Sequence, residues 1–171
     1  QPLLKAARAE PGDVVPVELA RALGNFETNA AAAVPVLKET LKQSPSPVAR
    51  EAALDALMRI FRSENERTEI LLSALRDDSD GVRREVPNFL TMRQAKAIAQ
   101  KLVPEIERLL NNPRVAGSAE LHRMLSLVEM LGPAAKPLLP LLEELHRKET
   151  DAGRRSALAA GISSIKTPDQ E

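Results

Sequence analysis

The chain of 171 residues contains no cysteine, no tryptophan and no tyrosine, and only three phenylalanines. The absence of cysteine excludes disulfide bonds, thiolate zinc sites and cysteine nucleophiles. Because aromatic side chains are so scarce, the core must be built from Leu, Ala, Val and Ile, which interdigitate between closely spaced helices. An excess of either charge is lacking too: 24 basic and 24 acidic residues leave no overall field that favours nucleic acid or an anionic membrane.

Long apolar runs are also missing. No run approaches the roughly 20 residues that a helix needs to cross a bilayer, so we expect no membrane span. The sequence begins Gln1-Pro2-Leu3-Leu4, without an initiator methionine. Two interpretations stay open: one segment of a longer protein, or a mature chain whose export signal has been removed. The compartment is therefore left unknown, either cytoplasmic or exported, for a chain expected to be soluble.

What the sequence does contain is a set of residues that recur together at multiples of about 35 positions. The columns are Ser46, Asp80 and Asp151; Arg50, Arg84 and Arg155, four positions later; and Val14, Val48 and Val82. A fixed period in this range is typical of stacked supersecondary units, each of which buries its apolar face against a neighbour. The repeat therefore predicts the architecture more firmly than the function.

Apolar residues at spacings of three and four predict amphipathic helices along nearly the whole chain, and no segment alternates like a strand. The clearest expected helices span residues 28–43, 47–61, 66–76 and 94–111. We predict an all-α fold: a right-handed α-α superhelix of about four to five helical pairs in a single array. The expected units are 1–25 (partial), 26–62, 63–92, 93–131 and 132–166.

The recurring columns have a structural explanation. An Asp or Ser just before a helix accepts a hydrogen bond from an otherwise unpaired amide, so the first column is expected to cap helices. An Arg four residues later can reach the cap or the turn carbonyls of the next unit. We interpret these residues as a structural ladder between units: Ser46, Arg50, Asp80, Arg84, Asp151 and Arg155.

Three prolines, Pro35, Pro104 and Pro140, are expected inside first helices, where each would remove a backbone bond and bend the helix. Bent first helices paired with the sequence Asp80-Gly81-Val82-Arg83-Arg84 at the start of a second helix resemble HEAT repeats. Weaker copies are Ser46-Pro47-Val48-Ala49-Arg50 and Asp151-Ala152-Gly153-Arg154-Arg155. The resemblance covers nearly the whole chain. It departs from the pattern in the middle, where Pro87 falls within a second helix and the unit at 93–131 lacks the Asp/Arg pair.

Catalytic and metal-binding groups are few. His122 and His146 are the only histidines, and neither has a metal-binding spacing with neighbouring carboxylates. Asp77, Asp78 and Asp80 lack the frame of a calcium loop and are better explained as a polar turn. We therefore expect no catalytic, metal or cofactor site.

The resemblance also brings an alternative, because some HEAT-like proteins are DNA glycosylases or resemble pigment lyases. Arginines do concentrate between residues 59 and 93, but acidic residues are interleaved with them, and no Trp or Tyr is present to stack on a base. We do not expect nucleic-acid binding. The alternative of a HEAT-like enzyme or nucleic-acid module is retained beside the main hypothesis.

The main hypothesis is a non-enzymatic scaffold that binds another protein or peptide, because a helical solenoid presents a long surface lined by its second helices. The outward positions expected on that surface are mixed in charge: Glu51, Asp55, Arg59, Arg84, Asn88, Glu120, Arg123 and Arg155. Self-association through the ends of the array is a second expected contact. The register fails from Pro87 through 111–118, so the candidate protein-binding surface is assigned to Arg84, Asn88, Glu120 and Arg123.

Overall fold

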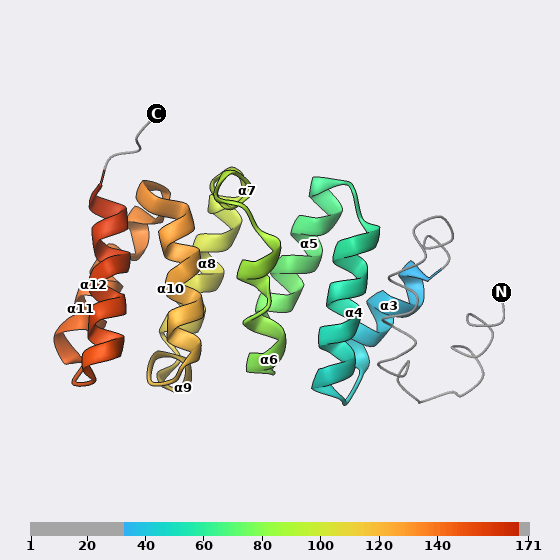
Figure 1. Cartoon of the computed structure of the whole chain (residues 1–171), viewed down its shortest axis with the longest axis horizontal. Helices are drawn as coiled ribbons and strands as arrows, with labels where there is room; N and C mark the ends of the chain where they lie inside the picture. Colours follow the sequence, from blue (N-terminus) through green and yellow to red (C-terminus); the bar gives the residue numbers. More distant parts are fainter. Residues whose placement is uncertain (1–32, 168–171) are drawn as a thin grey trace. The chain divides into compact units, whose positions relative to one another are not determined.

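The computed structural model describes residues 33–167, and these residues divide into two compact units between Val86 and Pro87. Helices form the regular structure of both units, and no strand occurs in this part of the chain (Figure 1). The prediction of an all-α helical-repeat fold is therefore confirmed. The right-handed superhelix and the single array over 1–171 stay predictions, and the partial unit expected at 1–25 lies outside the described residues.

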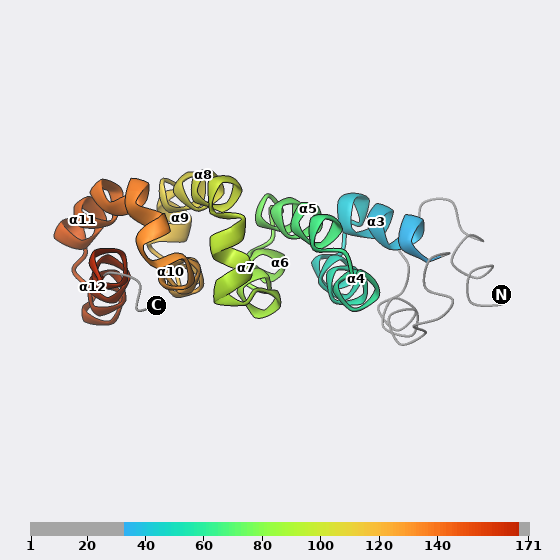
Figure 2. The ribbon, with the colours of Figure 1, turned by 90° about the horizontal axis from the view of Figure 1, so that it is seen from above.

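The first unit has two layers of helices. Its elements are α3 (Val34–Gln43), α4 (Pro47–Ile60), α5 (Glu64–Leu75) and α6 (Asp80–Arg83). Figure 2 shows α3 and α5 in one layer and α4 and α6 in the other. Helix α4 packs against α3, α5 and α6, so it is the centre of this unit.

The core of the first unit is aliphatic, as the shortage of aromatic residues requires. Its most deeply buried side chains are Leu37 of α3, Ala53, Leu54 and Leu57 of α4, Leu71 and Leu75 of α5, and Val82 of α6. Burial of each large aliphatic side chain contributes about 1.5–3 kcal/mol relative to exposure. Phe61 is buried at the end of α4, and the Lys38 ammonium lies 5.0 Å from the centre of its ring.

The second unit is built around α10. Its elements are α7 (Met92–Ala97), α8 (Ala99–Leu110), α9 (Pro113–Ala116), α10 (Glu120–Leu131), η3 (Gly132–Leu138), α11 (Leu139–Lys148) and α12 (Ala152–Lys166). A 3-10 turn, η2 (Val86–Phe89), connects the two units along the chain. Helix α10 packs against α7, α8, α9, η3 and α12, and it buries Leu121, Met124, Leu125, Leu127, Val128 and Leu131.

Glu120–Lys148 is long and apolar enough, by length and composition alone, to cross a membrane. Within this stretch Gly132 has a φ of 54°, which ends α10 before η3 and α11 begin. Apolar side chains along it, including Leu125, Leu138 and Leu142, are buried in the core of the second unit. Because core packing explains their hydropathy, the stretch is only a weak indication of a membrane span.

Two expected helices are broken in the structure. The helix expected from Val82 to Leu90 is divided into α6 and the 3-10 turn η2. Pro87 explains this break, because proline lacks the amide hydrogen of an α-helix and disfavours the α conformation in the residue before it. The helix expected at 94–111 is divided at Ile98 into α7 and α8, and α7 starts with a capping box formed by Thr91 and Gln94.

The prolines are only partly where the sequence predicted them. Pro104 lies inside α8, as expected. Pro35 and Pro140 instead lie in the first turns of α3 and α11, so the expectation of bends at these two positions was wrong. Proline is tolerated in a first turn because the amide it lacks has no partner within the helix there.

Candidate functional site

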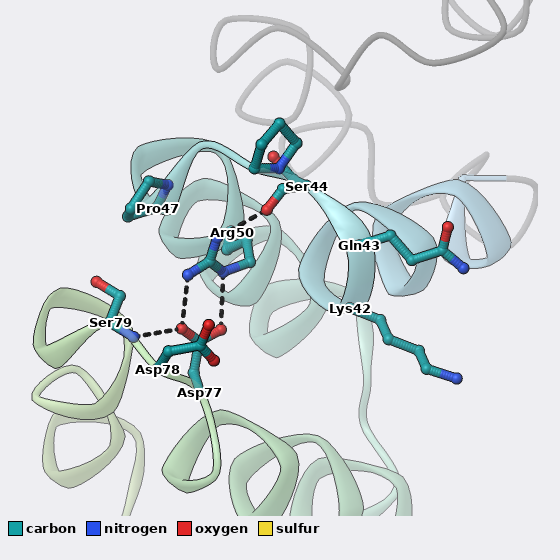
Figure 3. Close-up of a pocket in the computed structure, with 9 residues that line it drawn as sticks. Lys42, Gln43, Ser44, Pro47, Arg50, Asp77, Asp78 and Ser79 are labelled. Atoms are coloured by element: carbon teal, nitrogen blue, oxygen red, sulfur yellow. Dashed lines mark hydrogen bonds and ion pairs between the residues drawn. The ribbon is translucent and has the colours of Figure 1, made fainter.

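The best-defined polar cluster of the first unit joins two of its turns. The Arg50 guanidinium of α4 donates from Nε to Oδ2 and from Nη2 to Oδ1 of Asp77, both at 2.8 Å (Figure 3). A third donor, Nη1, bonds the Ser44 carbonyl at 2.7 Å. Arg50 therefore connects the α3–α4 turn, which contains Ser44, to the α5–α6 turn, which contains Asp77.

This cluster is both shielded and charged. The side chains of Arg50 and Asp77 are only 11% and 8% exposed. The hydrogen bond to Asp77 raises the pKa of the Arg50 guanidinium above its usual value; partial burial opposes this, and the charges of Asp77, Asp78 and Glu51 add to it. Asp77 Oδ1 also accepts the Ser79 amide at 2.8 Å, so both oxygens of this carboxylate are bonded.

The same contact occurs a second time in the unit, at an interval of 33 residues. Arg83 Nη1 bonds the Asp77 carbonyl at 2.6 Å, and Arg50 Nη1 bonds the Ser44 carbonyl, in each case six residues back along the chain. The helix caps follow the same interval, because Ser46 Oγ accepts the Ala49 amide and Ser79 Oγ accepts the Gly81 amide. The equivalent arginines are therefore Arg50 and Arg83.

The structure corrects the register that the sequence suggested. Ser46 caps α4 as expected, but Ser79 caps α6 and Asp80 is the first residue of that helix. Val48 is 53% exposed, whereas Val82 is fully buried, so these valines are not equivalent. Ala49 and Val82 are equivalent, since both are buried and they are 33 residues apart. Val14, the third member of that column, lies outside the described residues.

In the second unit the ladder residues also agree only in part with the sequence prediction. Asp151 caps α12 by accepting the Arg154 amide at 2.8 Å, as the sequence predicted. The arginine that forms an ion pair is Arg154, whose Nε and Nη2 bond Glu149 at 2.8 and 3.0 Å. Arg155 is exposed on the same helix, as Arg84 is in the first unit.

Glu149 is held by four donors. Besides Arg154, the backbone amides of Thr150 and Asp151 both bond Glu149 Oε1 at 2.8 Å. The hydrogen bond from Arg154, followed by that from the Asp151 amide, lowers the pKa of Glu149 to about 2. This side chain is 11% exposed, and the cluster orders the turn between α11 and α12.

A pocket of about 560 Å³ opens beside the Arg50 cluster, between the α3–α4 turn and the α5–α6 turn. Its lining comprises Lys42, Gln43, Ser44, Pro45, Pro47, Arg50, Asp77, Asp78 and Ser79. Figure 3 shows Arg50 directed toward Asp77, while the Lys42 and Gln43 side chains extend away from that pair. The sequence did not reveal this pocket, and the signal that could have indicated it is the 33-residue interval shared by Ser46 and Ser79.

The residues of the candidate protein-binding surface are divided between the units. Arg84 belongs to the first unit, and Asn88, Glu120 and Arg123 belong to the second. Arg84, Asn88 and Arg123 are exposed, but Glu120 is only 7% exposed, so its assignment as an outward residue was wrong. The Glu120 amide donates to Ser118 Oγ, two residues earlier. Glu120 is the first residue of α10, the most buried helix of the second unit, and its side chain lies toward the interior of that unit.

Three further sequence candidates, Asp55, Arg59 and His122, take part in contacts along their own helices. Asp55 and Arg59 form an exposed ion pair at 3.0 Å along α4. His122 is exposed, and its carbonyl accepts the Ser126 hydroxyl at 3.0 Å. Among residues 33–167 no group of three or more His, Asp or Glu side chains is arranged to hold a metal ion.

Paired helices, capped turns and arginine contacts between successive turns define a helical-repeat protein. A family model for HEAT repeats matches residues 1–86, which are half of the chain and coincide with the first compact unit. The chain belongs to the HEAT-repeat family. No curated protein and no solved structure matches it.

Proposed function

We propose that this chain is a non-enzymatic scaffold that binds another protein, and that the pocket between the α3–α4 and α5–α6 turns of the first unit contributes to the binding surface. The observation that carries the proposal is which polar side chains of the pocket are bonded to other described residues and which are not. Arg50 and Asp77 bond each other, whereas Lys42, Gln43 and Asp78 form no side-chain hydrogen bond or ion pair within residues 33–167. Groups of this kind are available to a partner without breaking contacts among the described residues.

Membership of the HEAT-repeat family supports the proposal, because solenoid repeats stack into extended surfaces that bind peptides and other domains. The polar character of the pocket also agrees with a protein partner. Its opposite charges do not favour a uniformly anionic ligand such as nucleic acid, since Asp78 would repel the phosphates. Arg84 of the first unit, and separately Asn88 and Arg123 of the second, are retained as candidate partner-binding residues.

The test is site-specific photo-crosslinking with a photoreactive amino acid placed at Gln43 in the pocket. We expect a discrete protein adduct from a lysate of the source cells, and a weaker adduct when Asp78→Lys is added. The matched control places the same group at Lys136, an exposed residue of η3 in the second unit. Absence of an adduct at Gln43, together with measurable DNA binding at physiological salt, would reverse the proposal in favour of nucleic acid.

A further inference from the structure

The pocket of the first unit has opposite charges on different elements. Four charged residues line it, but Arg50 and Asp77 neutralise each other through two hydrogen bonds. The two remaining charges are Lys42, near the end of α3, and Asp78, in the α5–α6 turn. A ligand that pairs with both Lys42 and Asp78 therefore needs one negative and one positive group rather than a single charge.

Two residues of the pocket lining are apolar. These are Pro45 and Pro47, and Val48, the next residue of α4, is 53% exposed. Both prolines lack an amide hydrogen, so this part of the turn offers a partner fewer backbone donors than an ordinary turn. Pro45, Pro47 and Val48 are all exposed, and exposed apolar side chains favour contact with an apolar side chain of a partner.

The floor of the pocket is ordered before any ligand binds. Arg50 is fixed by three hydrogen bonds, and Ser44 is 7% exposed with its Oγ bonded to the backbone of Ser46. Groups that are already ordered lose little conformational entropy on binding, so even weak polar contacts add to the affinity. The long Lys42 side chain is the exception, because ordering it on binding costs conformational entropy.

Resting on the proposed function, we infer that the occupant is an extended protein segment that carries an acidic and a basic side chain with an apolar residue. The acidic group pairs with Lys42, the basic group pairs with Asp78, and the apolar residue packs on the exposed Pro45, Pro47 and Val48 side chains. An extended segment fits this arrangement because its successive side chains point to opposite sides and can reach both elements. The chemistry differs from that of a phosphate or a nucleic acid, which would leave Asp78 unpaired.

The experiment uses the full chain and short fluorescent peptides with a Gly/Ser background. Each peptide carries one Glu, one Leu and one Lys, in every order, and the reference peptides carry Gln in place of both charged residues. The variants are Lys42→Glu and Asp78→Lys, with Lys136→Glu and Glu107→Lys as matched charge changes at exposed positions of the second unit. Binding is measured by fluorescence anisotropy at two salt concentrations.

We expect at least one of the Glu/Leu/Lys peptides to bind more tightly than its Gln-containing reference. The Lys42→Glu variant should bind that peptide about fivefold more weakly. Replacing the peptide Glu with Lys should restore binding to Lys42→Glu, and the second-unit variants should bind like the wild type. The inference is overturned if the reference peptides bind equally well, or if the second-unit variants lose as much affinity. It is also overturned if inorganic phosphate displaces the peptide while Asp78→Lys has no effect, because that result identifies a simple anion site.

The two proposals fail differently. If Gln43 crosslinks to a partner but the peptides show no charge preference, the scaffold function stands and the inferred partner chemistry is wrong. If the charged peptides bind as expected but the crosslinker at Gln43 captures nothing, the pocket chemistry stands and the cellular role is wrong.

Discussion

Arg50 and Asp77 are 27 positions apart in the sequence, yet their side chains share two hydrogen bonds of 2.8 Å. Arg50 lies in α4, and Asp77 lies in the turn that precedes α6. The pair therefore connects one helical pair of the first unit to the next. Because both side chains are almost fully shielded, removing one of them leaves the other charge without its main partner.

The first prediction concerns this pair. Arg50→Ala should lower the free energy of unfolding of the first unit by about 2–4 kcal/mol, because it leaves the Asp77 carboxylate shielded and without its main partner. Arg50→Lys should recover only part of the loss, since an ammonium cannot reproduce a two-bond contact. The measurement is amide hydrogen exchange of α3 to α6, which reports the first unit separately.

The matched control for this prediction is Arg84→Ala. Arg84 is exposed, and the structure assigns the equivalent contact to Arg83, so the change should be within about 0.5 kcal/mol. A loss at Arg84 comparable to that at Arg50 would contradict the 33-residue register.

The second prediction tests the register through apolar residues. Val82→Ala should cost about 2 kcal/mol, because Val82 is fully buried and two methyl groups are lost from the core. Val48→Ala should change stability by less than about 0.5 kcal/mol, because Val48 is 53% exposed. Chemical denaturation followed by circular dichroism compares the two identical substitutions, and equal costs would restore the 34-residue register.

The third prediction is a pH dependence caused by Glu149. Its pKa is about 2 in the folded protein against an ordinary value of 4.5, so its contribution to stability is complete above about pH 4.5. That contribution should decline as the pH falls from about 4.5 toward 2, and Glu149→Gln should remove this part of the acid dependence. Thermal melts across this range measure the effect, and an NMR titration of the Glu149 carboxyl measures the pKa directly.

Glu144→Gln is the comparison for the acid experiment. Lys148 lowers the pKa of Glu144 through a hydrogen bond, but both side chains of this pair are about half exposed or more. Its substitution should therefore affect the acid melts less than Glu149→Gln does. If the two variants have the same profile, the four-donor cluster around Glu149 contributes no special stability.

The fourth prediction concerns the end of α10. Gly132→Ala should destabilise the second unit by about 1–3 kcal/mol, because a φ of 54° with a ψ of −130° is strained for any residue with a Cβ. Gly81→Ala provides the contrast. A Cβ there would meet the flexible end of the Glu51 carboxylate, which can move aside, and would lie 3.2 Å from Ser79 Oγ, so only side-chain atoms need to shift. Denaturation midpoints of the two variants check this difference, and a tolerated Gly132→Ala would contradict the assigned backbone conformation.

Most helices could be predicted because their apolar spacing is a local property. The ranges expected at 47–61 and 66–76 agree with α4 and α5 to within two residues at each end. The break at Pro87 could be expected from the proline itself. How many residues of the second helix stay helical on each side of it depends on tertiary packing, which the sequence does not show. Glu120 could not be predicted in this way. A charged residue in the first turn of a helix is normally exposed, and only the packing of the neighbouring helices shows that Glu120 is buried.

The sequence alone determined that this chain is a helical repeat, because a period near 35 and amphipathic spacing leave few other ways to bury its aliphatic residues. It could not decide between the adjacent Arg83 and Arg84, or between Val48 and Ala49, since a shift of one residue leaves the composition of the pattern almost unchanged. Only the tertiary structure decided these points. Burial separates one residue from its neighbour, and the contact between Arg50 and Asp77 exists only once two turns distant in sequence are brought side by side.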